Sequence, residues 1–442
     1  MTMHRAWLRG VLAASVVAVS LLPLGVSSAA ARADQAPTIG SARSAQLADW
    51  RQSRGDAAHR GWNQVESTLS LANVGSLQVL WKDSVGFNSS PAVANGVVYN
   101  GDGIRAFSAT CGNDGDYCSP LWTAPTGYPD WASPAVGAGM VYQQSLSGLY
   151  AFKVGCRSDG GQCSPVWTNL SDSAAYSSPT FASGWLYTTS QSTLQAFDVA
   201  RCAAGGGNCD PDWTADLGDT MSSAAVYQGR VFVVDASGYL RAFKAQCGTG
   251  GATCSPIWSG NLTAPTEGTP AVANGVVYVT TYDAQAYAFS TTCGSHGATC
   301  NPLWHTQLTG GHTHASVAVT DSTVYFVTGH RIFAYSTTCV SGGGTCTALW
   351  RSGKPDASGS FASSPAIANG VLYIGIQGVN QSNGKLIAFK ANCATDGRTC
   401  YAVWRSPLLG GMTNSSPAVA HGQVYVSTNG GTFYAFGLPP AP

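Results

Sequence analysis

A pair of histidines is the first feature of this sequence whose residue type and spacing could do chemistry. His312 and His314 are separated by one residue, so both side chains would point the same way on an extended strand. Such a pair can bind a metal ion when a third ligand joins it, for example Glu267. The alternative is that both histidines, with nearby His305, are structural or exposed to solvent. We keep His312 and His314 as metal candidates and predict no metal site.

Carboxylates are the second group with chemical potential. Several acidic residues precede strand-like runs of the chain: Asp130, Asp172, Asp219, Glu267 and Asp356. Two of them at a suitable separation could be the acid and base of a polysaccharide-cleaving enzyme. No G-x-S-x-G, H-E-x-x-H or phosphate-loop motif occurs in the sequence. We therefore predict no catalytic residue and keep polysaccharide cleavage as an alternative.

Cysteines are the third group, and their spacing is regular. All fourteen fall into pairs with six residues between the partners. The pairs are Cys111/Cys118, Cys156/Cys163, Cys202/Cys209, Cys247/Cys254, Cys293/Cys300, Cys339/Cys346 and Cys393/Cys400. Zinc-binding cysteines usually stand about two to four residues apart, whereas a longer, glycine-rich gap suits pairing across a hairpin. We predict seven local disulfides, each worth about 2–3 kcal/mol through the loop it closes.

Tryptophans and short apolar runs show that the cysteine pairs belong to a repeat. A tryptophan follows each second cysteine by four positions, and another precedes the first pair. They are Trp81, Trp122, Trp167, Trp213, Trp258, Trp304, Trp350 and Trp404. The cysteine pairs recur every 45 or 46 residues, with 54 across the last interval. Three further runs (S-S-P-A-V-like, V-V-Y-like and Ala-aromatic) recur eight times and have the composition of strands.

Four short strands in about 45 residues is the period of a β-propeller blade. We therefore predict an all-β chain that forms an eight-bladed β-propeller of four-stranded antiparallel blades. The last repeat ends without its tryptophan strand, while residues 77–85, which contain Trp81, match that strand alone. The N-terminal strand should therefore complete the last blade, which removes the exposed edge of an open array. The last blade then has no turn between its third and fourth strands, and so no cysteine loop. This explains why the chain has seven cysteine pairs but eight repeated tryptophans.

The N-terminus has the pattern of a secretory signal peptide. Arg5 and Arg9 precede an apolar run, and an A-x-A cleavage site ends at Ala33. The expected division is 1–33 signal peptide, 34–76 N-terminal segment, 77–437 propeller and 438–442 C-terminal tail. Export favours disulfides over free thiols. We expect a secreted, extracellular monomer that does not insert into a membrane.

Charge limits the classes of partner. Charged residues make up 10% of the chain, with 22 basic and 22 acidic side chains, against a usual share of about 25%. No basic stripe is present, so nucleic acid is not an expected partner. The expected partner is an unidentified extracellular ligand, such as a glycan or a cell-surface component.

The order of these elements resembles the quinoprotein-type, or PQQ-like, β-propeller repeat. That repeat has an Ala near the end of its third strand, an Asp two positions later, a Thr-Gly turn, and a Trp ten residues after the Ala. Here Ala106 and Trp122 are sixteen positions apart, a cysteine loop replaces the turn, and the Asp occurs only as Asp198. Residues 50–81, with Gly61-Trp62-Asn63, also resemble the leading segment of secreted members. The resemblance implies that the eight repeated tryptophans dock neighbouring blades.

The resemblance also provides an enzymatic alternative, a PQQ-dependent dehydrogenase. Members with that activity use a calcium-bound quinone, a catalytic Asp and often two adjacent cysteines. This sequence has no adjacent cysteines and no C-x-x-C-H haem motif. We predict no cofactor, with PQQ and calcium belonging to this alternative alone.

In a propeller the residues just before each inner strand line the mouth of the central channel. In this chain they are Asn88, Trp131, Tyr176, Met221, Glu267, His314, Phe361 and Asn414. They differ strongly while the scaffold around them repeats, and mixed aromatic and polar groups suit a carbohydrate or another small polar ligand. The alternative is that they are ordinary loop residues. The longer loop between Gln377 and Lys385 would lie on the same face, as a lid, a contact loop or an inert insertion. The sequence favours a secreted binding or scaffold propeller without catalysis.

Overall fold

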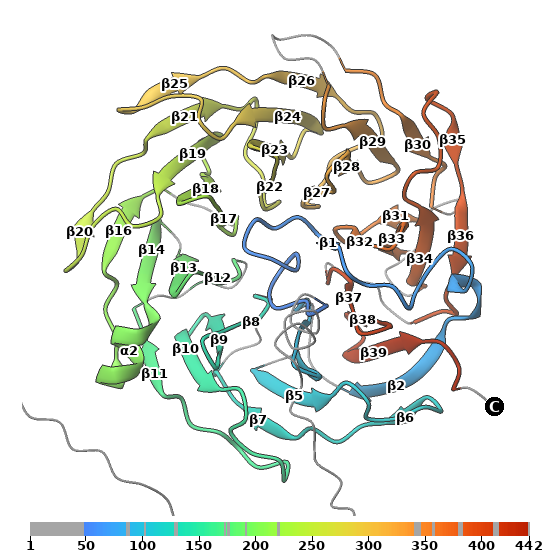
Figure 1. Ribbon diagram of the computed structural model, residues 1–442, viewed down its shortest axis with the longest axis horizontal. Helices are drawn as coiled ribbons and strands as arrows, with labels where there is room; N and C mark the ends of the chain where they lie inside the picture. Colours follow the sequence, from blue (N-terminus) through green and yellow to red (C-terminus); the bar gives the residue numbers. More distant parts are fainter. Residues whose placement is uncertain are drawn as a thin grey trace, which may run out of the picture.

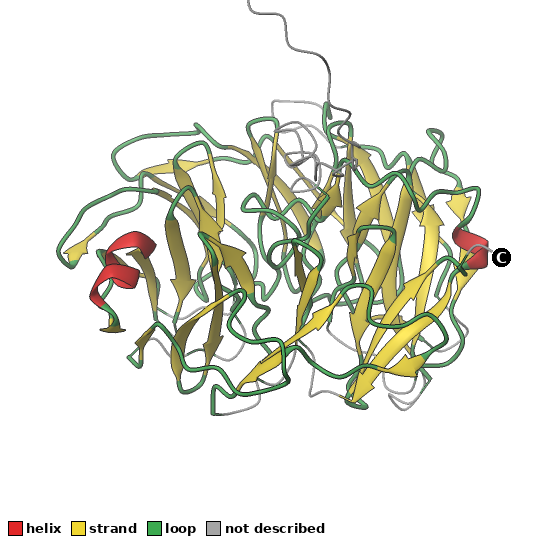
Figure 2. Ribbon diagram, turned by 60° about the horizontal axis from the view of Figure 1, so that its bottom comes forward, coloured by secondary structure: helices red, strands yellow, loops and turns green. Residues whose placement is uncertain are grey.

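The strands of this chain form a ring of eight sheets around a central axis (Figure 1). The computed structural model describes residues 48–84, 89–100, 103–127, 131–171, 174, 177–190, 192–218, 222–339, 346–355, 359–378, 383–409 and 415–440. Seen obliquely, the sheets stand around the axis and the loops gather at the two faces and the outer edge (Figure 2). The predicted eight-bladed, nearly all-β propeller is confirmed. Residues 1–33, predicted as a signal peptide, lie outside the described residues.

The inner strands, which we call A strands, are short and built from small or β-branched residues. They are β3 (Ala92–Ala94), β8 (Ala135–Gly137), β12 (Thr180–Ala182), β17 (Ala225–Tyr227), β22 (Ala271–Ala273), β27 (Ala318–Val319), β32 (Ala366–Ala368) and β37 (Ala418–Ala420). Small residues are needed here because eight strands converge on the axis. Tight turns then lead outward: Asn95 and Gly96 both have positive φ, as the two-residue turns of twisted hairpins require.

The two middle strands of each blade carry most of the buried apolar residues. The B strands are β4 (Val97–Asn100), β9 (Met140–Ser145), β13 (Trp185–Thr189), β18 (Arg230–Val234), β23 (Val276–Thr280), β28 (Thr323–Val327), β33 (Val371–Gln377) and β38 (Gln423–Ser427). The C strands are β5 (Ile104–Ser108), β10 (Gly148–Lys153), β14 (Thr193–Asp198), β19 (Tyr239–Lys244), β24 (Gln285–Ser290), β29 (Ile332–Ser336), β34 (Lys385–Lys390) and β39 (Thr432–Gly437). Both sets are buried on two faces because every blade is packed between two others.

The outer D strands carry the repeated tryptophans. They are β7 (Trp122–Ala124), β11 (Trp167–Asn169), β16 (Trp213–Asp216), β21 (Trp258–Asn261), β26 (Trp304–Gln307), β30 (Trp350–Ser352), β36 (Ala402–Arg405) and β2 (Gln78–Ser84). Strand β2 is antiparallel to β39, with Trp81 opposite Ala435. The predicted closure is confirmed: the N-terminal strand completes the last blade, over Gln78–Ser84.

Within the described residues six blades have more than four strands, so the expectation of four strands per blade was incomplete. The seventh blade gains β1 (Trp62–Asn63) and β31 (Ser360–Phe361). Five other blades have a fifth strand that comes from a cysteine loop. These strands are β6 (Asp116–Tyr117), β15 (Gly207–Asn208), β20 (Ala252–Thr253), β25 (Ala298–Cys300) and β35 (Thr399–Cys400). Each comes from the cysteine loop of one blade and runs parallel to the D strand of the preceding blade, as β6 does to β2. In Figure 1 they lie on the outer edge of the ring.

The seven predicted disulfides are all formed, and the structure describes no free cysteine. The second cysteine of every pair is a core residue, with 2–6% of its surface exposed. These buried cysteines are Cys118, Cys163, Cys209, Cys254, Cys300, Cys346 and Cys400. The sequence prediction took each pair only as the closure of its own turn. That view was incomplete, because the neighbouring blade covers the second cysteine and makes it part of a blade junction.

Each buried cysteine packs in a cluster with the tryptophan of the preceding blade around the ring. The pairs are Cys118 with Trp81, Cys163 with Trp122, Cys209 with Trp167, Cys254 with Trp213, Cys300 with Trp258, Cys346 with Trp304 and Cys400 with Trp350. The indole Nε1 of Trp81 also donates to the carbonyl of Ala109, two residues before Cys111. The disulfide loops therefore hold neighbouring blades together as well as closing their own turns.

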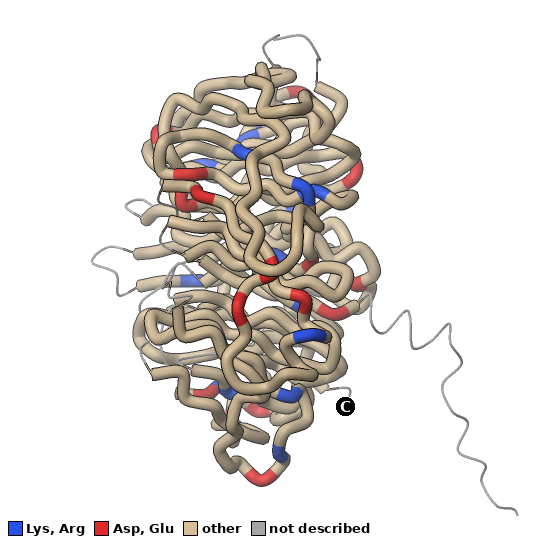
Figure 3. The backbone as a smooth tube through the Cα atoms, turned by 90° about the vertical axis from the view of Figure 1, so that its left-hand side faces the viewer, with Lys and Arg blue, Asp and Glu red and all other residues tan. Residues whose placement is uncertain are grey.

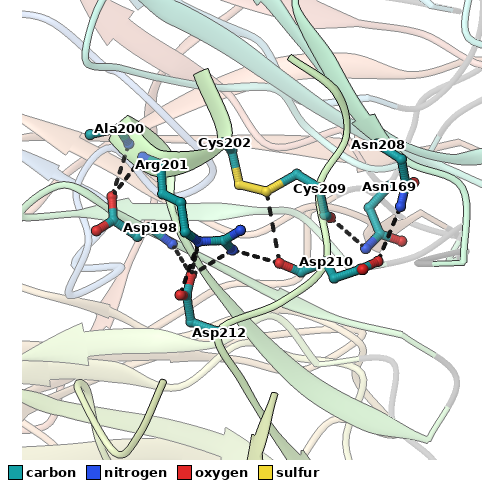
Figure 4. Close-up of a disulfide and its surroundings, with 9 residues drawn as sticks. All are labelled: Asn169, Asp198, Ala200, Arg201, Cys202, Asn208, Cys209, Asp210 and Asp212. Atoms are coloured by element: carbon teal, nitrogen blue, oxygen red, sulfur yellow. Dashed lines mark hydrogen bonds and ion pairs between the residues drawn. A yellow bond between two sulfur atoms is a disulfide. The ribbon is translucent and has the colours of Figure 1, made fainter. Parts of the chain in front are cut away.

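The loop of the third blade shows how these contacts are made (Figure 4). Asp198 caps the short helix α2 (Val199–Gly205) by accepting hydrogen bonds from two backbone N–H groups. Arg201 on this helix forms an ion pair with Asp212, N to O distance 2.8 Å. Asn169, on the D strand of the second blade, donates to the carbonyl of Cys209 at 2.8 Å. The single Asp of the PQQ-like pattern therefore acts here as a helix cap.

The junction between the seventh blade and the last blade is covered differently from the other blade junctions. The last blade has no cysteine loop, and the 3₁₀ turn η1 (Val74–Ser76) lies against β36 instead. Val74 packs in the same cluster as Trp404. Trp404 retains 9% of its surface exposed, whereas Trp81 is fully buried.

Candidate functional site

Residues 48–66, which we call the strap, lie across the inner strands near the centre of the ring (Figure 1). Backbone carbonyls of the strap accept hydrogen bonds from the A-strand amides of six blades: Val93, Val136, Val226, Val272, Val319 and Ile367. The Gln52 side chain accepts from the amide of Phe181. Asn63 donates to the carbonyl of Val419, and β1 (Trp62–Asn63) is parallel to β32. The strap therefore contacts all eight blades in their order along the chain.

A cavity of about 270 Å³ lies at the centre of the ring. Its lining comes from the strap, from the starts of the A strands and from the loops before them: Ser53, Arg54, Ser90, Trp131, Ser133, Ser178, Ser223, Glu267, Thr269, His314, Ala315, Ser316, Ala362, Ser363, Ser364 and Ser416. Every blade contributes to this lining. Because the strap residues Ser53 and Arg54 form one end, we call that end the floor and the opposite end, with Trp131, Glu267 and His314, the rim.

Eight hydroxyl residues make the wall of the cavity, and we call them the serine collar. They are Ser90, Ser133, Ser178, Ser223, Thr269, Ser316, Ser364 and Ser416. The backbone N–H of one collar residue donates to the hydroxyl oxygen of the next, and seven such bonds of 2.8–3.2 Å are formed. The accepting oxygens are thereby held in place, and no bond in which one of these hydroxyls donates its own hydrogen is formed within the described residues.

Arg54 forms the floor of the cavity and is only 2% exposed. Its Nη2 donates to the carbonyls of Pro365 at 2.6 Å and Val317 at 3.2 Å. Its Nε and Nη1 have no hydrogen-bond partner within the described part of the chain. Burial lowers the pKa of Arg54 to about 9, with Asp56 partly opposing the shift. The side chain is nevertheless charged at neutral pH.

The residues near Arg54 do not neutralise its charge directly. Asp56 forms its ion pair with Arg60, at 2.5 Å. The buried side chain of His59 bonds Thr180 at 2.9 Å, and burial, with Arg54 nearby, lowers its pKa to about 3. His59 is therefore neutral, and Arg54 carries the positive charge of the floor. Arg54 also has a positive φ of 61°, a strained backbone conformation of the kind that clusters at functional sites.

The rim carries an ion pair and an aromatic cluster. His314 Nδ1 is 2.8 Å from the Glu267 carboxylate. This hydrogen bond raises the pKa of His314 and lowers that of Glu267, against a smaller opposing effect of burial. His312 instead stacks on Tyr282, with ring centroids 4.5 Å apart. Among the described residues no group of three His, Cys, Asp or Glu side chains is placed to hold a metal ion.

We expect the Glu267→Gln variant to bring the pKa of His314 down towards the ordinary value of histidine, because the variant removes the carboxylate. NMR titration of the histidine rings measures this change. His421, whose pKa is raised by Asp49 at 2.8 Å, is the control and should titrate as before. Since folding raises the pKa of His314 and lowers that of Glu267, the pair stabilises the fold fully between a pH of about 4.5 and about 6.5, and it stops doing so above the raised pKa of His314 and below the lowered pKa of Glu267. An unchanged His314 titration would contradict the assignment.

The predicted mouth residues have different positions in the structure. Trp131, Glu267 and His314 line the cavity, and Trp131, in the second blade, lies on the opposite side of the ring from His314, in the sixth. Phe361 lies in β31 (Ser360–Phe361), which pairs with β33, and packs on Phe389 in the core. Strand pairing turns this side chain away from the channel, so it is a core residue. Asn88, Tyr176, Met221 and Asn414 lie outside the described residues.

Sequence reasoning missed Arg54 and the serine collar. The collar had a signal, since a serine recurs just before the inner strands of seven blades. We assigned that run to the strand and did not consider its hydroxyls. Arg54 had no comparable signal, because it stands in an irregular segment and eight distant strands bury it.

Charge elsewhere on the ring is sparse and mixed in sign (Figure 3). Exposed ion pairs are local, such as Arg157 with Asp159 and Arg398 with Asp396. No helix among the described residues is long and apolar enough to cross a membrane. The seven disulfides indicate folding in an oxidising environment.

The ring and its docking tryptophans define a β-propeller protein with a floored central cavity. Residues 210–339 match the family described as outer membrane protein assembly factor BamB. A search of curated proteins found no match. The propeller and this match, which covers the middle of the chain, support the resemblance of the repeats to the PQQ-like β-propeller repeat family.

Solved structures with the same fold include BamB and two dehydrogenases. BamB from Moraxella catarrhalis superposes with a TM-score of 0.59 and 13% identity, covering 83% of this chain and 99% of its own. Quinohemoprotein alcohol dehydrogenase from Comamonas testosteroni superposes with a TM-score of 0.65 and 12% identity, covering 91% of this chain and 82% of its own. A europium-containing methanol dehydrogenase superposes with a TM-score of 0.63 and 10% identity, covering 89% of this chain and 99% of its own. At these identities the likeness concerns the fold.

Proposed function

We propose that this chain is an exported, non-catalytic binding propeller that takes a small polar ligand into its central cavity. The observation that carries the proposal is the cavity itself, with a floor from the strap and a wall of oriented hydroxyls. Convergent polar groups in a concave site are typical of small-molecule binding. Trp131, 39% exposed at the rim, adds the aromatic surface that sugars and similar ligands use.

The binding role is supported by the family match and by the sequence. Among the five candidate carboxylates, Glu267 lines the cavity and is paired with His314, and the other four, Asp130, Asp172, Asp219 and Asp356, lie outside the described residues. The matching family is described as an assembly factor, which is a non-enzymatic role. The absence of adjacent cysteines and of a haem motif from the sequence agrees with it.

The proposal is tested by calorimetric titration with a panel of small polar compounds: glucose, galactose, glucosamine, glucuronate, glycine and lysine. We expect at least one to bind, and either Trp131→Ala or His314→Ala to weaken that binding about tenfold, because truncating a residue that is a binding hot spot costs over 1 kcal/mol. The control is Tyr401→Ala, which alters a 74% exposed side chain outside the cavity lining. No binding from the panel, or binding that neither rim variant changes, would overturn the proposal.

A second candidate, a PQQ-dependent dehydrogenase, is favoured by the fold similarity to the two dehydrogenases. Its test adds PQQ and Ca²⁺ to the pure protein and follows dye reduction with alcohol substrates. Dye reduction would replace the non-catalytic proposal with this one.

A further inference from the structure

We propose that the central cavity is selective for a monoanion, and that a carboxylate group of the ligand binds to Arg54. The inference rests on the proposed function, because it names the chemical class of ligand for the same cavity. Its evidence is the state of the Arg54 side chain and the direction of the hydroxyl groups around it.

Arg54 is a buried cation with unused donors. Its Nε and Nη1 are buried without a partner within the described residues, while Nη2 is held by two backbone carbonyls. Leaving charged donors unpaired in a buried site is costly. A propeller could fill this place with an apolar side chain, as many cores do. An anion in the cavity would balance the charge of Arg54 at the floor, and a shift of the guanidinium towards the cavity would give the unpaired N–H groups, which have almost no accessible surface, the acceptor that they lack.

The serine collar supplies donors of the same kind. The collar hydroxyls serve as acceptors in the ring of seven bonds. Their hydrogens are therefore the groups left to offer to a ligand, and a hydroxyl hydrogen seeks an acceptor. A ligand with acceptor oxygens satisfies floor and wall together, whereas an ammonium ligand would meet a cation at the floor and hydroxyl hydrogens at the wall, with Glu267 as an acceptor only at the rim.

The charge count favours a single negative charge. Arg54 is the one Lys or Arg among the described residues that line the cavity, and Glu267 adds a negative charge at the rim beside His314. A carboxylate balances one guanidinium, whereas a phosphate dianion would leave excess charge near Glu267. The expected ligand is a small organic acid or an acidic sugar such as a uronic acid, with its carboxylate towards the floor.

The strap fixes Arg54 in position for this role. Gly61 donates its N–H to the carbonyl of Arg54 at 2.8 Å. A Cβ at Gly61 would lie 2.0 Å from the Arg54 Nη2, so the loop is shaped closely around the guanidinium. Arg54 itself keeps a strained backbone conformation. These features place the charge at the cavity floor before any ligand arrives.

The test compares glucuronate with glucuronamide, a neutral compound of nearly the same shape, by calorimetric titration of the wild-type protein. We expect glucuronate to bind about 10- to 100-fold more tightly, the effect of hydrogen bonds to charged groups. Sodium sulfate is the third probe, and it should bind more weakly than glucuronate. Tighter binding of sulfate would overturn the assignment to a carboxylate.

A variant test assigns the effect to Arg54. We expect Arg54→Met to bring the affinity for glucuronate down to that for glucuronamide, with Tyr401→Ala as the matched control. If the variant fails to fold, the two-ligand comparison on the wild-type protein decides the proposal alone. Equal affinity for both ligands, or binding to neutral or basic panel compounds only, would overturn the inference and leave the cavity-binding function standing. Binding to nothing in the panel would overturn both.

Discussion

Replacing Trp81 by alanine is expected to lower the free energy of unfolding by about 3–5 kcal/mol, the usual cost of removing a buried tryptophan. Trp81 contacts Phe107 of the first blade, and Tyr425 and Phe433 of the last. Trp81 belongs to the last blade, so its contacts join the last blade to the first blade. Its removal leaves a cavity where the two ends of the chain meet. Chemical denaturation followed by near-ultraviolet circular dichroism measures the loss.

Trp404→Ala is the matched control for Trp81. Trp404 occupies the equivalent position one blade earlier, but η1 covers it in place of a disulfide loop, and it retains 9% exposure. We expect this variant to lose about 2–3 kcal/mol, since less surface and fewer contacts are given up. An equal or larger loss for Trp404 would contradict the idea that the disulfide loops strengthen the tryptophan junctions.

Removing the strap is the second change with a large expected effect. A chain that begins at residue 64 loses the acceptors of six A-strand amides. Each hydrogen bond is worth about 1 kcal/mol, and the burial of Trp50 adds about 2–3 kcal/mol. We therefore expect a loss of roughly 8–9 kcal/mol from these two terms. The cavity also loses its floor, so ligand binding should disappear.

Hydrogen exchange gives this prediction a residue-specific measurement. The amides of Val93, Val136 and Val226 should exchange much faster in the truncated chain. The amides of the C strands, such as Phe243, pair within their own blade and should keep their protection. A chain that begins at residue 48 is the control. Unchanged exchange at the three A-strand amides would show that the strap is not needed to protect them.

Most of the architecture could be predicted because the same residue types recur at the same positions of each repeat. Residues 77–85 match the tryptophan strand of the repeat without its other three strands, and this located the closure of the ring. The cysteine spacing located the disulfides. The fifth strands could not be predicted, since Asp116 and Tyr117 have no strand pattern and pair only because the free edge of β2 lies beside them. The burial of Cys163, Cys254 and Cys346 has the same cause, because a neighbouring blade covers each of them. Structure that depends on a neighbouring blade has no local signature.

The site could be predicted only in outline. The position before the inner strand led to Trp131, Glu267 and His314, which line the cavity, and their role in binding stays a prediction. The same rule placed Phe361 at the mouth, but pairing with β33 buries it. Arg54 acquires its role from Pro365 and Val317, which are 311 and 263 residues away. A role created by such distant contacts cannot be seen in the local sequence.

The path of the strap has a consequence for biosynthesis. The strap and β2 are synthesised first. However, Asn63 bonds the carbonyl of Val419, which lies 356 positions later in the chain, and β2 can pair only after β39 has been made. The cysteine partners, in contrast, are seven positions apart and can meet while each repeat emerges. Blade junctions can thus be assembled early, whereas the floor of the cavity is completed last. The floored cavity exists only in chains that have been made at least as far as Val419, so the ligand binding that we propose would report closed molecules.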